Sequence, residues 1–381
     1  MTTARRWTFR ALVASLSLGG ASAVPAQGTL STQGLGFPPG QLSTHAITMG
    51  GATGEADAQS PLNPAAIGFM LGAIVMMQAE PEYRELRIGD RTQRTSVSRF
   101  PLFHGGLQLG SRWAVSLSAS TLFDRTWETV TRDSQVINAE TIRHTRTQRS
   151  DGSINDLRLA VAFAPKPWLR IGVGGHALSG RDQISTILAF DDTVRFVTDV
   201  QASSVSFGGN AVSIGAQTLF ARKASVGVSY RKGGGISAYE GRETVGRGSA
   251  PDHYGASLIY LGITGTALAV RVARDEWSNL DGMAPTLNIH EGWDGGVGAD
   301  VTGPTYGSRP VALRVGGRWR TLPFSASSTP VKERTVSGGF GFPMARGAVQ
   351  LNLGVLRAWR SDGADTSENG WTISTGFAVR P

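Results

Sequence analysis

The most informative absence in this 381-residue sequence is cysteine, which does not occur at all. Disulfide bonds, thiolate catalysis, cysteine-ligated metals and a lipidated cysteine are therefore excluded. Long apolar runs are missing too, because the longest, residues 69–77, has about half of the ~18–20 residues that a membrane helix needs. A helical membrane protein is thus excluded. A β-barrel is not, because its alternating strands give only a weak hydropathy signal.

Recognisable catalytic patterns are also missing. No Gly-x-Ser-x-Gly elbow or phosphate-binding loop occurs, and the pair Asp191-Asp192 is interpreted as a solvated loop tip rather than a cation site. None of the six histidines falls in a metal-ligand spacing: His45, His104, His144, His176, His253 and His290. We therefore predict that the protein is not an enzyme, with no catalytic residue, no metal site and no cofactor.

A large charge excess is missing as well, since the net charge is +8 and the basic residues are dispersed. This argues against nucleic acid as a partner. The first 27 residues have the pattern of a secretory signal, with basic Arg5, Arg6 and Arg10, an apolar stretch at 11–18 and small residues at 21–26. We predict that residues 1–27 direct export and that their removal lowers the net charge to +5.

What the sequence does contain is period-two alternation, in segments such as 113–123, 157–163 and 371–379. One parity carries branched aliphatic and aromatic residues, and the other carries Gly, Ser, Asn and Arg. Five tryptophans fall at strand ends on the apolar parity, as in an interfacial girdle: Trp113, Trp168, Trp319, Trp359 and Trp371. The pattern favours a membrane barrel over an exported soluble sandwich, which remains the alternative.

Tight turns alternate with longer polar stretches, which is the asymmetry of an outer-membrane barrel. The sequence therefore predicts an all-β fold, a transmembrane antiparallel barrel of about fourteen strands over residues 67–381, with both chain ends on the periplasmic side. Proline cannot donate to a β-ladder, so a kink is expected at Phe100-Pro101. Residues 278–308 are predicted to be a long loop, either a lid or a surface excursion, with the surface excursion preferred. The predicted strands are 67–79, 84–110, 112–131, 138–164, 167–189, 195–221, 224–240, 252–262, 265–277, 308–319, 320–328, 332–342, 347–360 and 370–380.

Residues 28–66, between the export signal and the first strand, are rich in Gly and Ala and cannot form a core of their own. We expect this segment to be ordered only inside the barrel, as a hatch (plug) in its lumen. The triplet Asn63-Pro64-Ala65 is predicted to anchor and gate it.

The stretch from Gly50 to Ala66, which closes on Asn63-Pro64-Ala65 before a strand array, resembles the N-terminal hatch of FadL-type outer-membrane transporters of long-chain fatty acids and aromatic hydrocarbons. The runs 313–319 and 337–342 are similar to that family's last hairpins. Two positions depart from the family pattern: Ala58 replaces a second acidic residue after Asp57, and the chain ends in Pro381 instead of the aromatic residue that assembly machinery reads. The resemblance implies transport of a hydrophobic molecule.

Arginines on the lumen parity are the one charged pattern of interest. An inward guanidinium excess would attract a carboxylate headgroup, for which Arg314 and Arg318 are the candidates. The preferred alternative is that these arginines form ladders with carboxylates and hold the wall in shape. The set comprises Arg158, Arg170, Arg231, Arg271, Arg314 and Arg318, with Asp124, Glu128 and Asp156 on the same parity.

Together these features predict passive transport of long-chain fatty acids or aromatic hydrocarbons through a plugged barrel in the bacterial outer membrane. The alternative is a barrel that serves in secretion or assembly and docks a protein partner. The expected partners are a hydrophobic small molecule, outer-membrane lipid and, during biogenesis, the barrel assembly machinery, and a monomer is expected. The sequence identifies neither the solute nor whether the lumen opens to the periplasm or sideways.

Overall fold

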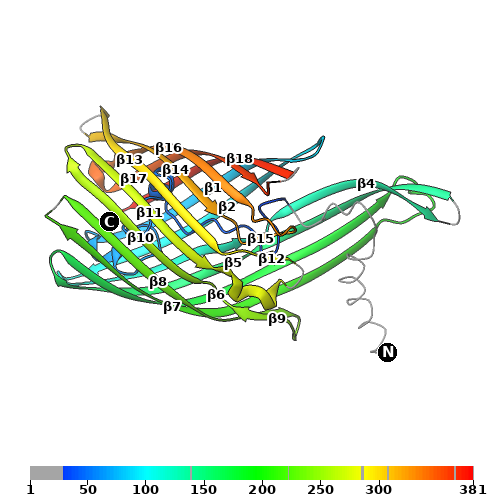
Figure 1. Cartoon of the computed structure of the whole chain (residues 1–381), viewed down its shortest axis with the longest axis horizontal. Coiled ribbons are helices and arrows are strands. Elements are labelled where there is room, and N and C mark those ends of the chain that lie inside the picture. The colour runs from blue at the N-terminus through cyan, green and yellow to red at the C-terminus, as the bar shows by residue number, and fades with distance from the viewer. Residues whose placement is uncertain are drawn as a thin grey trace.

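The computed structural model describes residues 29–137, 140–221, 223–284, 287–306, 309–363 and 366–380. The predicted export signal, Arg222 and Pro381 lie outside these residues. Fourteen antiparallel strands form a closed barrel (Figure 1), as predicted. They are β1 (Ala73–Ile88), β2 (Arg91–Leu109), β3 (Trp113–Asp124), β5 (Glu140–Lys166), β6 (Leu169–Phe190), β7 (Asp199–Phe220), β8 (Ala224–Glu240), β10 (Asp252–Ile263), β11 (Thr266–Glu276), β13 (Gly292–Tyr306), β14 (Arg309–Thr321), β16 (Lys332–Met344), β17 (Val349–Ser361) and β18 (Thr366–Val379).

The barrel closes because β1 pairs with both β2 and β18. On the other side of the barrel β8 pairs directly with β10, so β9 is not one of the barrel strands. Side chains alternate across the wall as the sequence predicts: Leu159 is 60% exposed and its neighbour Arg158 only 1%. All five girdle tryptophans are about half exposed on the outer face. An outward apolar belt of this kind, rimmed by tryptophan, is the surface of a membrane barrel.

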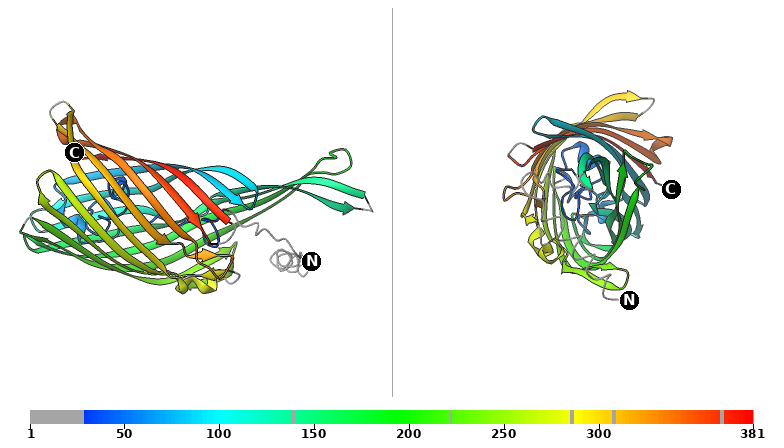
Figure 2. Two further views of the ribbon diagram at one scale, coloured as in Figure 1. Left: turned by 45° about the horizontal axis from the view of Figure 1, so that its top comes forward. Right: turned by 90° about the vertical axis from the view of Figure 1, so that its right-hand side faces the viewer.

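The two ends of the barrel differ. At one, here called the turn end, short turns join β2 to β3, β5 to β6 and β7 to β8, and the first and last strands also meet there. At the other, the loop end, hairpins project well beyond the barrel (Figure 2). β4 (Trp127–Ile137) pairs only with β5, and β9 (Glu243–Ser249) only with β8. Strand β5 has 27 residues, far more than the ~9–11 that cross a bilayer.

Some predicted boundaries were wrong. Residues 278–308 are not one long loop: the chain forms the 3-10 helix η2 (Trp277–Met283), the short strand β12 (Asn288–Ile289) and then barrel strand β13. The predicted strand 320–328 is instead the end of β14 followed by a loop that holds β15 (Phe324–Ser325), which pairs with β12. Because β13 was missed and the strand 320–328 was wrongly predicted, the count of fourteen is still correct. Glu128 lies on the β4 hairpin and not on the lumen wall.

The N-terminal segment lies inside the barrel, where Figure 2 shows it in blue within the ring of strands. It contains helix α2 (Thr44–Thr48) and the 3-10 helix η1 (Ala66–Phe69), which leads to β1 at the turn end. The short 3-10 helix η3 (Ala345–Gly347) forms one of the turns. Apart from α2, η1, η2 and η3, the described residues form strands, turns and loops, and none of these helices is long and apolar enough to cross a membrane.

Candidate functional site: the hatch, the lumen and a pocket through the wall

The hatch seats on a patch of the wall that is made of glycine. A Cβ atom at Gly316 would lie 2.1 Å from the backbone of Met49 and Gly50, and one at Gly298 would lie 2.3 Å from the Met49 carbonyl oxygen. Gly296 likewise faces the carbonyl oxygen of Gly50. Any side chain at these wall positions would push the hatch out of its seat. The glycines of the lumen parity therefore make room for the hatch backbone.

The predicted anchor Asn63-Pro64-Ala65 is fully buried between hatch and wall. The Asn63 amide donates to the carbonyl oxygen of Glu55 at 2.7 Å and to that of Ala216 in β7 at 3.1 Å, and its oxygen accepts from the Ala65 N–H at 2.9 Å. Pro64 packs over Gly172 of β6. One asparagine thus joins two parts of the hatch to the wall, because an amide both donates and accepts.

Glu55 forms an ion pair between hatch and wall. Its carboxylate accepts from the Arg271 guanidinium at 2.7 and 3.0 Å and from the Ser257 hydroxyl at 2.8 Å, with His253 at 3.4 Å. Burial raises the pKa of Glu55, but the charge of Arg271 and the hydrogen bonds from His253 and Arg271 outweigh it and hold the pKa at about 2. Glu55 is therefore ionised at neutral pH and forms a buried ion pair with the wall.

Asp57 and His45 form a second polar contact. The Asp57 carboxylate accepts from the hydroxyls of Ser43 at 2.5 Å and Ser60 at 2.7 Å. His45 lies between Asp57, at 3.7 Å, and Asp300 of β13, at 3.6 Å. Burial disfavours the charged forms of both Asp57 and His45. The contacts with His45 and the two serines nevertheless hold the pKa of Asp57 at about 2. The contacts with Asp300 and Asp57 likewise outweigh burial and raise the pKa of His45 above 6.5.

The two arginines proposed for a ligand headgroup already have partners in the protein. Arg314 donates to Asp300 and to Asn352, each at 2.8 Å. Arg318 donates to both oxygens of Asp294, at 2.8 and 2.6 Å. This geometry matches the arginine–carboxylate ladder that was the alternative interpretation of the lumen charges.

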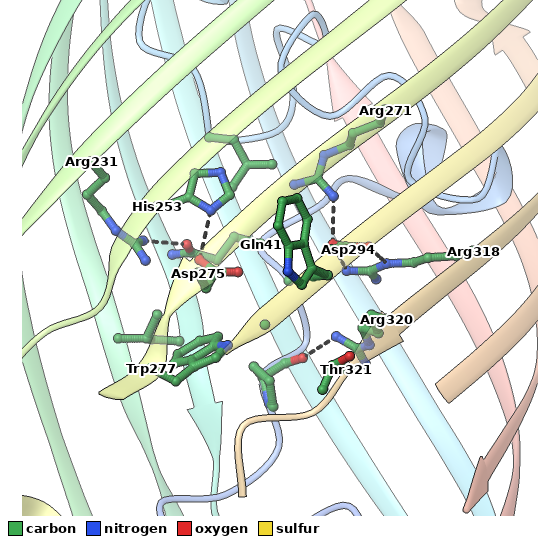
Figure 3. Close-up of a pocket in the computed structure, with 16 residues that line it drawn as sticks. Gln41, Arg231, His253, Arg271, Asp275, Trp277, Asp294, Arg318, Arg320 and Thr321 are labelled. Atoms are coloured by element: carbon green, nitrogen blue, oxygen red, sulfur yellow. Dashed lines mark hydrogen bonds and ion pairs between the residues drawn. The ribbon is translucent and has the colours of Figure 1, made fainter. Parts of the chain in front are cut away.

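A cavity of about 40 Å³ lies between the hatch and strands β10–β14 (Figure 3). Gln41 of the hatch, Trp277 and the Arg271–Asp294–Arg318 chain of ion pairs surround it. This space is large enough for water but far smaller than the cavity of ~150 Å³ that admits benzene.

The loop end of the lumen is closed by residues 29–40. The ring of Phe37 lies among four guanidinium groups, with 4.7 to 5.5 Å from ring centroid to guanidinium carbon. The backbone of Phe37 forms a two-way bridge to Asp124 of β3, at 2.8 Å in each direction. The four guanidiniums are those of Arg84, Arg99, Arg320 and Arg360, which form ion pairs with Glu82, Asp124, Glu333 and Glu368.

An apolar cluster lies in the lumen beside Phe37 and its four arginines. Trp277 and Leu280 of η2 are buried against Phe123, Phe207 and other inward side chains of the wall. The alternation over residues 113–123 places Phe123 on the same parity as the outward-facing Trp113. The pairing of β3 with β5 shifts by one residue between Thr121 and Phe123, however, and both Leu122 and Phe123 are buried in the lumen.

The wall itself is interrupted at Phe100-Pro101, the predicted kink. The register between β1 and β2 shifts there, so that two residues of β2 stand opposite Ala79. Pairing of β2 with β3 ends at Leu102–Ser120. A pocket of about 200 Å³ occupies the gap, here called the wall pocket. Its lining includes the outward-facing Met77, Phe100 and Phe103 and the inward-facing Gln78, Leu102 and Ser120.

Hatch residues close the inner end of the wall pocket. The Gln41 amide donates to the Ser120 hydroxyl at 2.7 Å, and the Gln78 amide donates to the Leu42 carbonyl oxygen at 3.1 Å. Displacement of this part of the hatch would connect the lumen with the outer face of the barrel.

Several solved structures have a similar fold. A FadL homologue of Pseudomonas aeruginosa superimposes with a TM-score of 0.59 at 11% identity, over 91% of this chain and 99% of that one. The chain has the FadL fold. The CymD monoaromatic hydrocarbon channel matches with a TM-score of 0.59 at 14% identity, over 89% of this chain and 97% of that one. The Pseudomonas putida toluene transporter TodX matches with a TM-score of 0.59 at 12% identity, over 89% and 98%.

No family model and no curated protein matches this sequence. Within the described ranges, no group of three or more His, Asp or Glu side chains is placed to hold a metal ion. Sequence reasoning missed Glu55 and Phe37 as contacts of the hatch. For Glu55 a signal existed, because a carboxylate in a Gly/Ala segment that must be buried requires a cationic partner.

Proposed function

We propose that this protein is a member of the FadL-type family and a passive channel for hydrophobic molecules in the bacterial outer membrane. The observation that carries the proposal is the wall pocket, which lies where β2 and β3 separate and whose inner end is in contact with the hatch. The structural similarity to the CymD monoaromatic hydrocarbon channel and the toluene transporter TodX supports it.

The proposed route begins at the loop end and leaves sideways. A solute enters at the projecting hairpins, displaces the apolar contacts of η2 and residues 29–40, and reaches the hatch. A shift of Gln41 and Leu42 then opens the wall pocket, through which the solute passes into the bilayer. No energy input is needed, because transfer of apolar surface from water to the bilayer is favourable by itself.

Sugars and peptides are poor substrates for such a route. The wall pocket offers few hydrogen-bonding groups, and a polar solute that is desolvated without partners loses several kcal/mol per group. The proposed substrates are therefore long-chain fatty acids or aromatic hydrocarbons.

A chain-length series tests the proposal. Each buried CH₂ group contributes ~0.8 kcal/mol, so affinity for n-alkanoates is expected to rise about fourfold per carbon until the pocket is full. Calorimetric titration of the protein in lipid nanodiscs measures this directly. Affinity that does not depend on chain length would contradict the channel and favour a barrel that docks a protein partner, for which the exposed β4 hairpin offers an unpaired strand edge.

A further inference from the structure

A larger pocket than the wall pocket lies on the outside of the barrel, near the loop end of β17, β18, β1 and β2. Its volume is about 520 Å³. It crosses β18, drawn in red in Figure 2, which pairs with β17 on one side and with β1 on the other. This pocket is here called the outer groove. Its lining residues on the outward parity of these strands are Tyr83, Glu85, Arg94, Ser96, Arg357, Asn369 and Trp371.

Arg357 of β17 is the unusual residue of the outer groove. It lies on the same face of the strand as Val355 and Trp359, which are 49% and 45% exposed and face lipid. Its guanidinium carbon is 4.9 Å from the ring centroid of Trp371 and 5.7 Å from that of Trp359. No hydrogen bond or ion pair joins it to another described residue. The aromatic contacts engage the face of the guanidinium group and leave its N–H donors available to a ligand.

The outer face around Arg357 carries a surplus of positive charge. Within the described residues of β1, β2, β16, β17 and β18, Glu85 is the one carboxylate on the outward parity, and it pairs with Arg94 at 2.9 Å. The other basic side chains on this parity have no ion pair with a described residue. A surplus of this kind attracts an anion. The basic residues on this face are Arg87, Arg94, Lys332, Arg334 and Arg357.

The register places the outer groove at the depth of the aromatic girdle. Trp371 pairs with Arg357 on one side and with Tyr83 on the other, and side chains paired in this way are about 5 Å apart. Val355 and Ile373 form the next outward-facing rung toward the middle of the barrel, and both are exposed to lipid. Aromatic girdles mark the boundary between hydrocarbon and headgroups. A lipid with its headgroup in the outer groove therefore has its acyl chains over an apolar wall.

We propose that the outer groove binds the phosphorylated headgroup of a glycolipid of the outer leaflet. The Arg357 fork matches two phosphate oxygens, and Arg94 adds a second cation at the rim of the groove. Tyr83, Ser96 and Asn369 supply hydrogen-bonding groups for the sugar. The inference goes beyond the channel function and shares with that proposal only the orientation in which the loop end faces the cell exterior.

The test measures equilibrium binding of radiolabelled diphosphoryl lipid A, an acylated and phosphorylated disaccharide, to the full chain in detergent micelles. Wild type is expected to bind it at least about tenfold more tightly than dephosphorylated lipid A with the same acyl chains, as hydrogen bonds to charged groups allow. Excess inorganic phosphate should displace no more of it than sodium chloride of equal ionic strength. Displacement by inorganic phosphate beyond that level would identify a site for free anions and overturn the lipid assignment.

Arg357→Gln should weaken binding of diphosphoryl lipid A at least about tenfold and change that of the dephosphorylated form less than about twofold. The matched control is Arg112→Gln, which removes an exposed arginine beside Trp113 at the turn end and should bind as wild type does.

Arg94→Glu covers the case in which Arg357→Gln does not fold. Its side chain is 82% exposed, so the fold should tolerate the change, while the reversed charge at the rim should also weaken binding of the phosphorylated form. No preference for phosphate in wild type, or a preference that survives both substitutions, would overturn the inference. Neither result bears on the channel, because Arg94 and Arg357 do not line the wall pocket.

Discussion

Removal of the Glu55 carboxylate should unseat the hatch. In Glu55→Ala, Arg271 keeps Asp294 at 2.6 Å but loses two hydrogen bonds, and Ser257 loses its acceptor. Loss of one partner from a buried ion pair destabilises by about 3–5 kcal/mol. At 1.4 kcal/mol per factor of ten, the lower value already raises the population of the unseated hatch more than about a hundredfold.

Hydrogen exchange followed by mass spectrometry measures that population, because the amides of residues 41–66 exchange when the hatch leaves its seat. Protection in these peptides should fall by about two orders of magnitude, while the barrel strands keep theirs. Glu243→Ala, at an exposed carboxylate of β9, is the control and should change nothing. Unchanged exchange in residues 41–66 would refute the argument, as would an equal loss of protection throughout the barrel.

Two further predictions concern pH and orientation. His45 has a raised pKa when the hatch is seated, so its contribution to the stability of the seated hatch is fully present below pH 6.5 and is lost as the pH rises through that raised pKa. Hydrogen-exchange protection of residues 41–66, corrected for intrinsic exchange, should therefore fall over that pH range in wild type. In His45→Gln it should stay level. Val194, 95% exposed at the loop end, and Lys166, at the turn end, should face opposite sides of the membrane. A membrane-impermeant thiol reagent should label Val194→Cys but not Lys166→Cys on intact cells, and the reverse would invert the proposed orientation.

The barrel was predictable from the sequence because its signal is local. Alternation of apolar and small residues determines which side of each strand meets lipid, and five tryptophans mark its ends. Phe123 shows the limit of this reasoning, since a one-residue register shift breaks the alternation and buries Leu122, Phe123 and Asp124 in succession. Such a shift depends on the partner strand, which the local pattern does not contain.

Strand β13 was missed for a physical reason. Its sequence is rich in glycine and contains Pro304, which reads as a loop when local preference alone is considered. Gly296 and Gly298 are glycines because the hatch backbone passes directly over them, and Pro304 falls where the register between β13 and β14 shifts. The positions of these glycines and of Pro304 are explained by contacts between segments that are far apart in the chain.

The contacts of the hatch lay beyond reach of the sequence for a similar reason. Glu55 and Arg271 are 216 residues apart, and nothing local distinguishes Arg271 from Arg158. The lumen arginines were identified as a set from their parity. Only the three-dimensional arrangement separates those that donate hydrogen bonds within the protein from Arg158, whose guanidinium nitrogens have no hydrogen-bond partner among the described residues.

The most direct test of the central claim is to block the wall pocket. Ala119 lines it from β3, so Ala119→Trp should fill the opening, whereas Ala177→Trp places the same side chain on the lipid face of β6 away from it. Uptake of radiolabelled dodecanoate by cells that lack other routes is the measurement, with both variants expressed at equal levels. The proposed route predicts that Ala119→Trp abolishes uptake and that Ala177→Trp retains it. Equal uptake by the two variants would contradict a path through the wall.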